Sequence, residues 1–293
     1  MKKLIQCSAI SLLILLSQSA LAANCDRGCL TDAMTTFLNA LEKGDSKLLP
    51  LAKNVRFTED TVEKKLGEGL WTSKVKLGSY RQDFIDVKQG VAGAHVILEE
   101  NGNPTMFVTR LKVDDNKKLS EIETMVVRSR EEGLIFRPDN LNEPTDIMQY
   151  KPTVAERNSR EEAIAAAKHY PDGLKIGSFV EIDAPFAEGA YRFENGQTMA
   201  GQGCPERFKG CENIKTQKIP KLSDIRARLA AVDEEMGIVW YRLDFGGGAR
   251  EGNALIVWEA FKIWGGEIHA VEAFMEMMPK GADSGWDSIY PQS

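Results

Sequence analysis

The feature that most constrains the fold is a pattern that occurs twice along the chain. In the first copy, an apolar helical segment stops at Gly44, and a proline-containing stretch then leads into the run 54–60, NVRFTED. In the second copy, the segment around Tyr170 stops at Gly177, and a proline-containing stretch leads into the run 190–196, AYRFENG. Glycine after an apolar helical pattern is typical of a helix end. The repeat therefore predicts two structural units that share one topology.

The far ends of the two copies also correspond. Strand patterns at 107–113 and 119–127 in the first copy have counterparts at 255–263 and 268–275 in the second. Each copy has its helix first and then strands joined by tight turns, which differs from an alternation of strands and helices. The predicted fold class is α+β, with N-terminal helices packed on a curved antiparallel sheet in each unit.

The segments outside the two units are distinct in composition. Residues 1–22 combine a basic start, an apolar run and an Ala-x-Ala motif, which is typical of a secretory signal peptide. We expect the first unit at 23–135, a linker rich in Pro, Asn, Asp and Glu at 136–158, the second unit at 159–280 and an irregular tail at 281–293, whose tryptophan packs back on the body. No later segment has the length and apolarity of a membrane span. We therefore expect a periplasmic or secreted protein.

The cysteines agree with an oxidising compartment. Of the five cysteines, Cys7 falls in the signal peptide. The remaining four form two local pairs, Cys25–Cys29 and Cys204–Cys211, which are candidate disulfides. A metal site of four thiolates is the alternative, but neither spacing is the C-x-x-C typical of zinc.

Composition and motifs exclude several classes of partner. The chain has 43 acidic and 37 basic residues, a net charge of −6, and no basic patch interleaved with aromatics, so nucleic acid is not an expected partner. The 3 histidines are scattered, without the H-x-H or H-E-x-x-H spacing of a zinc site. There is no G-x-S-x-G motif, and the glycines at 246–248 lack the residues of a phosphate loop. We expect no metal and no organic cofactor.

The run 41–59, LEKGDSKLLPLAKNVRFTE, resembles the start of a SnoaL-like domain of the nuclear-transport-factor-two-like (NTF2-like) superfamily. The two units together, with C-x-E-R-F at 204–208, V-D-E-E-M-G at 232–237 and S-G-W at 284–286, resemble a family of secreted bacterial and fungal proteins of unknown function. The resemblance implies two tandem cone-shaped units, each with a pocket between helices and a curved sheet. It does not specify the chemistry, since this fold hosts isomerases, cyclases, dehydratases and plain binders.

A hairpin in the second unit predicts a pair of facing carboxyls. The glycines at 265–266 separate two apolar strands, and counting back from this turn places Glu259 opposite Glu272 on the apolar face. Like charges across a strand pair repel, and apolar surroundings raise the pKa of a carboxyl. Such a pair can share a proton and act as acid and base. Alternatively, one glutamate pairs with an arginine, such as Arg192 or Arg226, or reaches water at the sheet edge.

The same count in the first unit predicts a second or degenerate site. The turn at 114–118 places Thr109 opposite Glu123, so that a Thr/Glu pair stands where the second unit has Glu/Glu. Among the histidines, His95 is the alternative base, but we expect it on the face of its strand opposite the apolar one. We expect His269 to pack at the junction between the units.

Five further residues are candidate ligand contacts. Arg192 would position an anionic or carbonyl group, or hold one glutamate ionised, and Arg56 is its counterpart in the first copy. Trp71, Tyr80 and Arg81 could line the mouth of a pocket. The alternative for these three is ordinary core packing, with the arginine reaching out to solvent.

The sequence predicts an exported small-molecule enzyme of the lyase, isomerase or dehydratase type, which uses carboxylate acid–base chemistry without a metal. A non-catalytic periplasmic protein that binds a small ligand is the first alternative. The second is an interaction scaffold, in which the sheet faces that carry Trp258 and Trp264 pack against each other or form a homodimer. A titration of ligand binding well above the normal range of glutamate would separate the enzyme from the plain binder.

Overall fold

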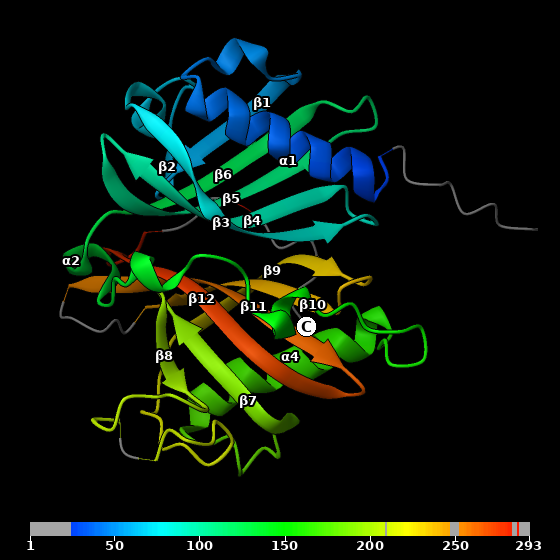
Figure 1. The fold of residues 1–293 in the computed structure, drawn as a ribbon, viewed down its shortest axis with the longest axis vertical. Coiled ribbons are helices and arrows are strands. Elements are labelled where there is room, and N and C mark those ends of the chain that lie inside the picture. Colours follow the sequence, from blue (N-terminus) through cyan, green and yellow to red (C-terminus); the bar gives the residue numbers. More distant parts are fainter. Residues whose placement is uncertain (1–24, 209, 247–251, 283–285, 287–293) are drawn as a thin grey trace, which may run out of the picture.

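The computed structural model describes residues 25–208, 210–246, 252–282 and Trp286. Two six-stranded sheets lie one above the other, and each has its long helix on the side away from the other sheet (Figure 1). The strand order is β2-β1-β6-β5-β4-β3 in the first sheet and β8-β7-β12-β11-β10-β9 in the second. The α+β class is confirmed, and the common strand order is what the sequence repeat predicts. The predicted signal peptide at 1–22 lies outside the described residues.

Each unit contains one long helix followed by six strands, and the first unit has two 3-10 helices in addition. The first consists of α1 (Arg27–Glu42), the 3-10 helix η1 (Ser46–Leu48), β1 (Leu51–Glu59), β2 (Val62–Glu63), the 3-10 helix η2 (Gly69–Thr72), β3 (Val75–Asp86), β4 (Val91–Glu100), β5 (Asn103–Val113) and β6 (Leu119–Val127). The connection carries α2 (Arg130–Gly133), the 3-10 helix η3 (Pro138–Asn140) and α3 (Asp146–Gln149). The second consists of α4 (Arg160–Ile176), β7 (Phe186–Glu194), β8 (Gln197–Ala200), β9 (Ile225–Asp233), β10 (Ile238–Phe245), β11 (Asn253–Trp264) and β12 (Glu267–Pro279).

Local chemistry fixes the ends of the two long helices. A capping box opens α4, since the Ser159 hydroxyl accepts from the Glu162 backbone and the Glu162 carboxylate accepts from the Ser159 backbone. Both helices end at the glycine stop signals, with φ of 65° at Gly44 and 83° at Gly177. The sheets are mixed, which corrects the purely antiparallel expectation: β1 joins β6 and β7 joins β12 in parallel.

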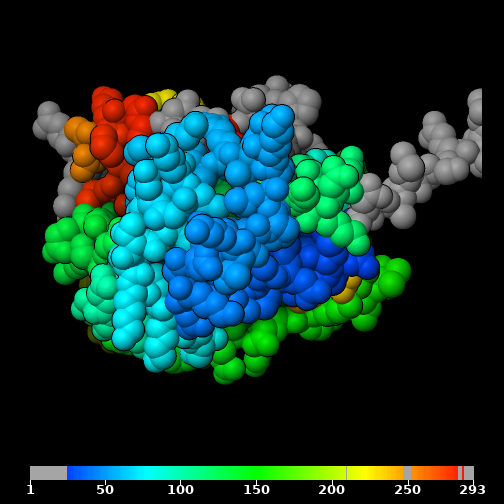
Figure 2. Space-filling model, turned by 90° about the horizontal axis from the view of Figure 1, so that it is seen from above, coloured from blue at the N-terminus to red at the C-terminus, as the bar shows by residue number. Residues whose placement is uncertain are grey.

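Three apolar layers hold the molecule together. In the first unit, α1 packs on the outer face of its sheet, and Figure 2 shows this helix at the surface of the molecule. In the second unit, α4 packs on the opposite outer face. The third layer lies between the two sheets, where Phe84, Trp240, Trp258 and Phe274 meet. We call this layer the seam. The sheet faces that the sequence offered for a homodimer are thus buried against each other within one chain.

Asn195, at the turn between β7 and β8, ties the connection between the units to the second sheet. Its side chain is buried, and its Nδ2 donates to the carbonyls of Gly133 at 3.1 Å, Ile135 at 2.8 Å and Met275 at 2.9 Å. Its Oδ1 accepts from the Met275 backbone at 2.8 Å. The last polar residue of the second-copy motif therefore has a structural role.

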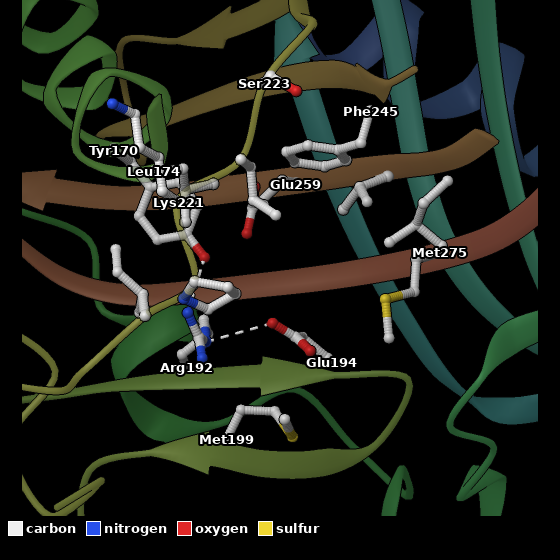
Figure 3. A pocket seen from close by; sticks show the side chains of 15 residues that line it. Tyr170, Leu174, Arg192, Glu194, Met199, Lys221, Ser223, Phe245, Glu259 and Met275 are labelled. Carbon is white, nitrogen blue, oxygen red and sulfur yellow. Dashed lines mark hydrogen bonds and ion pairs between the residues drawn. The ribbon is translucent and has the colours of Figure 1, made fainter. Parts of the chain in front are cut away.

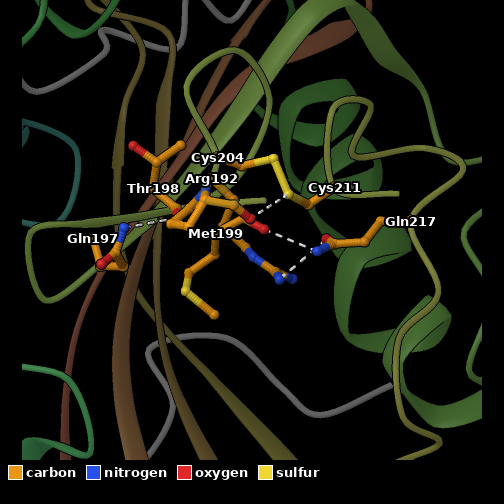
Figure 4. The surroundings of a disulfide bond; sticks show 8 residues. Arg192, Gln197, Thr198, Met199, Cys204, Cys211 and Gln217 are labelled. Atoms are coloured by element: carbon orange, nitrogen blue, oxygen red, sulfur yellow. Dashed lines mark hydrogen bonds between the residues drawn. A yellow bond between two sulfur atoms is a disulfide. The ribbon is translucent and has the colours of Figure 1, made fainter. Parts of the chain in front are cut away.

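The cysteines form the two local disulfides, Cys25–Cys29 and Cys204–Cys211, of which Figure 4 shows the second. The alternative of a four-thiolate metal site is therefore wrong. Trp286 packs back on the body as expected, since its Nε1 donates to the Thr58 hydroxyl at 2.8 Å. No helix among the described residues is long and apolar enough to cross a membrane.

Candidate functional site

A pocket of about 520 Å³ opens on the helix side of the second sheet (Figure 3). It lies between α4, the sheet strands and the segment 219–223. Its polar lining comes from Tyr170, Arg192, Glu194, Lys221, Ser223 and Glu259, and its apolar lining from Leu174, Met199, Ile219, Pro220, Leu222, Phe245, Leu255, Val257 and Met275. An apolar cavity with a few converging polar groups is the usual form of a small-molecule site.

Strand β7 brings Arg192 and Glu194 into the pocket together, because alternate residues of a strand face the same side. Arg192 Nε lies 3.2 Å from Glu194 Oε1. Its two Nη atoms donate to the Tyr170 hydroxyl and to the Gln217 side-chain oxygen, each at 3.2 Å. Figure 3 shows the Tyr170–Arg192–Glu194 chain of contacts along one wall. The guanidinium is held from three directions, so Glu194 is held with it.

Glu259 enters the same pocket from β11. The residue is 2% exposed, and its Oε2 has no hydrogen-bond partner among the described residues. Burial raises the pKa of Glu259 to about 8; the Glu194 carboxylate adds to the rise, while Arg192 and the Tyr170 hydroxyl oppose it. At neutral pH, Glu259 is therefore a protonated acid beside an ion pair, and it can donate a hydrogen bond or a proton.

The predicted partner of Glu259 is elsewhere. The glycine hairpin forms as expected, with Trp264 opposite Glu267, but a β-bulge follows and shifts the register by one residue. Glu259 consequently pairs with Ala273, and Glu272 pairs with Ala260. A one-residue shift moves a side chain to the other face of the sheet. The expectation that Glu259 and Glu272 face each other in one pocket is wrong.

Glu272 lies in the seam between the sheets. Its carboxyl accepts from the hydroxyls of Tyr191 at 2.6 Å, Tyr80 at 3.3 Å and Thr145 at 3.4 Å. Burial raises the pKa of Glu272 above its usual range, and these hydrogen bonds oppose the rise. The carboxyl thus joins the first unit, the connection and the second unit.

The first unit has the same bulge, with the same consequence. Thr109 pairs with Thr124 and Glu123 pairs with Arg110, so Thr109 and Glu123 do not face each other. Glu123 lies in the seam, where its Oε1 accepts from Arg228 Nη2 at 2.5 Å. Thr109 stays on the face toward α1 and is fully buried. The predicted second acid–base pair is therefore not assembled.

The parallel strand pairs show that the two Arg-Phe motifs are offset by one residue. In the first sheet Thr58 lies opposite Glu123, and in the second Phe193 lies opposite Glu272. Since these two glutamates are equivalent, Phe57 is the counterpart of Arg192. Phe57 packs in the layer under α1, so Arg56 lies on the other face of β1. Arg56 pairs with Glu63 at 3.0 Å and is not a pocket residue.

The other three predicted ligand contacts also lie outside the pocket. Trp71 is a core residue, with its ring 5.7 Å from that of Phe37. Tyr80 is in the seam beside Glu272. Arg81 forms a bidentate ion pair with Asp83, with both distances 2.7 Å. Trp71 therefore has the role given as the alternative, which is ordinary core packing. Of the five candidate ligand contacts, only Arg192 lines the pocket.

The two histidines considered as site or junction residues occupy ordered aromatic contacts. His95 lies on the face opposite α1, as expected, but this face is the apolar seam, and the residue is fully buried. It stacks on Phe274 at 4.5 Å and accepts from Trp240 Nε1 at 3.2 Å. Burial lowers the pKa of His95 to about 3, so it is neutral. His269 stacks on Trp264. No group of three or more His, Cys, Asp and Glu side chains among the described residues is placed to hold a metal ion.

Sequence reasoning missed five polar groups at the site, which are Tyr170, Glu194, Gln217, Lys221 and Ser223. The strand period gives a signal for Glu194, because it stands two residues after Arg192 and shares its face. Tyr170 lies on the buried side of α4. Gln217 and Lys221 belong to an irregular segment, where no periodicity places a side chain.

Comparisons with known proteins give limited likeness. A family model described as "Domain of unknown function (DUF8021)" matches residues 156–275, which include every residue that lines the pocket. Two solved NTF2-like proteins of unknown function are similar to part of the chain. The one from Cytophaga hutchinsonii is 13% identical, with 35% of this chain and 91% of that chain covered and a TM-score of 0.28. The one from Shewanella baltica is 11% identical, with 35% and 94% covered and a TM-score of 0.26. The comparison with curated proteins gives no match.

Proposed function

We propose that the second unit is a cofactor-independent enzyme of the lyase, isomerase or dehydratase type. The observation that carries the proposal is the buried Glu259 carboxyl, which shares one pocket with the Arg192–Glu194 ion pair. Two carboxyls in different environments divide the roles of acid and base between them. Glu259 is the acid, Glu194 is the base and Arg192 is the residue that positions the base.

The proton steps follow from these roles. Glu194 removes a proton from a carbon next to the polar group of the substrate, and the electron pair forms a new double bond. Glu259 donates its proton to the oxygen at the other end of that electron shift. If this oxygen is a carbonyl, the product is an enol; if it is a hydroxyl on the neighbouring carbon, it leaves as water. A proton returned from Glu194 to Glu259 through product or solvent restores the site.

The charges of the pocket favour a neutral substrate. Arg192 and Glu194 compensate each other, and Glu259 is protonated at neutral pH, so the buried floor has no surplus positive charge for a carboxylate. Lys221, the other cation of the lining, is exposed to solvent. The remaining lining is mostly apolar. A compact apolar molecule with one carbonyl or hydroxyl oxygen fits this arrangement, with the oxygen placed against Glu259.

The experiment is a screen for thermal stabilisation by neutral ketones, phenols and hydroxy compounds, each beside a matched carboxylate. A hit is then assayed for turnover with the wild type, Glu259→Gln and Glu188→Gln, the last an exposed control on β7. We expect Glu259→Gln to bind the hit but to lose turnover, since an amide cannot release a proton. Unchanged turnover in Glu259→Gln would refute the assignment.

A non-catalytic binding protein is the second candidate, and the mostly apolar wall of the pocket favours it. A binder needs Glu259 only as a hydrogen-bond donor, so Glu259→Gln would keep affinity and no hit would be turned over. The two candidates therefore differ in turnover and share the same ligand.

The proposed place of action is an oxidising compartment, the periplasm or the extracellular space. Two disulfides support this proposal, together with the predicted signal peptide. Protein purified from its native host should then begin at Ala23 and contain no free thiol. Detection of residues 1–22, or of reduced cysteines, would contradict export.

A further inference from the structure

A second recess lies outside the pocket, beside the connection between the units. It has a volume of about 510 Å³ and is lined by Arg130, Leu134, Ile135, Phe136, Arg137, Gln197, Arg207 and Phe208. Three of these residues are arginines and none is acidic, on a chain whose net charge is −6. We call this recess the arginine groove.

The three guanidinium groups lack counter-charges among the described residues. Arg130 Nε donates only to the Leu134 carbonyl, at 3.4 Å. Arg207 Nη2 donates to the Gln197 side-chain oxygen at 3.3 Å, and its guanidinium lies 4.7 Å from the Phe208 ring centre. No ion pair or side-chain hydrogen bond joins Arg137 to a described residue. Since a guanidinium has five N–H donors, most of this donor capacity is free for a ligand.

The walls of the groove are fixed from both sides. On one side, Asn195 binds the carbonyls of Gly133 and Ile135 and its own carbonyl accepts from the Arg137 backbone at 3.0 Å. On the other side, the Cys204–Cys211 disulfide closes the short loop that carries Arg207 (Figure 4). Backbone held in this way lowers the entropy cost of ordering the arginines on a ligand.

We propose that the arginine groove binds a multivalent oxyanion, a molecule that carries two or more phosphate, sulfate or carboxylate groups. The planar fork of arginine matches the oxygens of these groups in a bidentate manner. An exposed pair with one such group contributes little on its own. Three arginines in one groove therefore select a ligand that engages several of them at once, and Phe136 and Phe208 offer contact to an apolar part.

The test is calorimetric titration of the full chain with tripolyphosphate and with citrate, at low and at physiological salt. The variant Arg130→Gln/Arg137→Gln/Arg207→Gln is compared with Lys47→Gln/Lys53→Gln/Lys118→Gln, which removes the same charge from exposed sites in the first unit. Thermal unfolding checks that both variants fold.

We expect one-to-one binding to the wild type that weakens with salt and that falls at least about tenfold in the arginine variant. The lysine variant should stay close to wild type. Binding of either anion with this pattern supports the groove, and the stronger anion identifies the preferred group. No binding to the wild type, or an equal loss in both variants, would overturn the proposal. The outcome does not depend on Glu259 or on the enzyme proposal.

Discussion

The buried acid Glu259 makes the stability of the protein depend on pH in a way that one substitution removes. Its pKa is raised from 4.5 to about 8 by burial, with a contribution from Glu194. In the unfolded chain the carboxyl ionises near its ordinary value, whereas in the folded protein it stays protonated up to about pH 8. Folding therefore takes up a proton between these values, and stability falls as the pH rises from 4.5 to about 8. Over the whole interval, the rise in the pKa of Glu259 lowers the free energy of unfolding by about 5 kcal/mol.

The variant Glu259→Gln has the same shape and cannot ionise, so this dependence should be absent from it. We expect urea unfolding curves of the wild type and Glu259→Gln to diverge with pH, the variant gaining relative stability up to about pH 8 and staying level above it. The control Glu188→Gln changes an exposed carboxyl and should run parallel to the wild type. A stability difference between wild type and Glu259→Gln that stays constant from pH 5 to 9 would refute the buried-acid assignment, whatever its absolute size.

Three further predictions separate the pocket from the seam and the connection. Arg192→Gln should weaken ligand binding in the pocket, while Arg56→Gln, which changes the same motif in the first copy, should not; thermal shift with a screened ligand distinguishes them. Glu272→Gln should leave binding and turnover intact, since this carboxyl lies between the sheets, and a loss of turnover in a folded variant would contradict that placement. Asn195→Ala should lower the free energy of unfolding in urea by about 2–4 kcal/mol, because buried backbone groups lose their partner.

The sequence repeat was sufficient to predict the general plan of the molecule. It predicted two units with matching elements, the glycine ends of both helices and the hairpin at 265–266, and the structure has all of these. The local cysteine pairs were also predicted, because the members of each pair are close along the chain and neither spacing is the one typical of zinc. These features are determined by interactions between residues that are close along the chain, so the local sequence is sufficient to predict them.

The register beyond the hairpin could not be predicted, for a physical reason. A strand with one solvent-exposed face has alternating apolar and polar residues, and a bulge interrupts that alternation in the sequence. Here β12 is covered on both sides, by α4 and by the first sheet, so Val271 and Ala273 on one face are as apolar as Ala270 and Phe274 on the other. Without a polar face, a one-residue slip leaves no mark in the sequence.

The sequence analysis selected Glu259 and Arg192 as site residues but paired Glu259 with the wrong carboxyl. Both residues were selected for chemistry that the pocket supports, but Glu272 was assigned to their side by the missed bulge. The offset of the Arg-Phe motifs adds to the difference between the copies, since Phe57 fills the place where the second unit has Arg192. The two motifs have similar sequences, but their arginine side chains lie on different faces of the sheets.

The seam has a consequence for cooperativity. Each sheet uses the other as part of its own interior, and buried polar groups such as Glu123 and Glu272 have their partners across or within that layer. A fragment of the second unit alone would leave Trp240, Trp258 and Glu272 facing water without their contacts to the first unit. A fragment of the first unit would leave Glu123 without Arg228. The two copies should therefore melt in a single transition, and the segment 156–275 should not fold when expressed by itself. The two copies that repeat in the sequence should therefore form one cooperative folding unit.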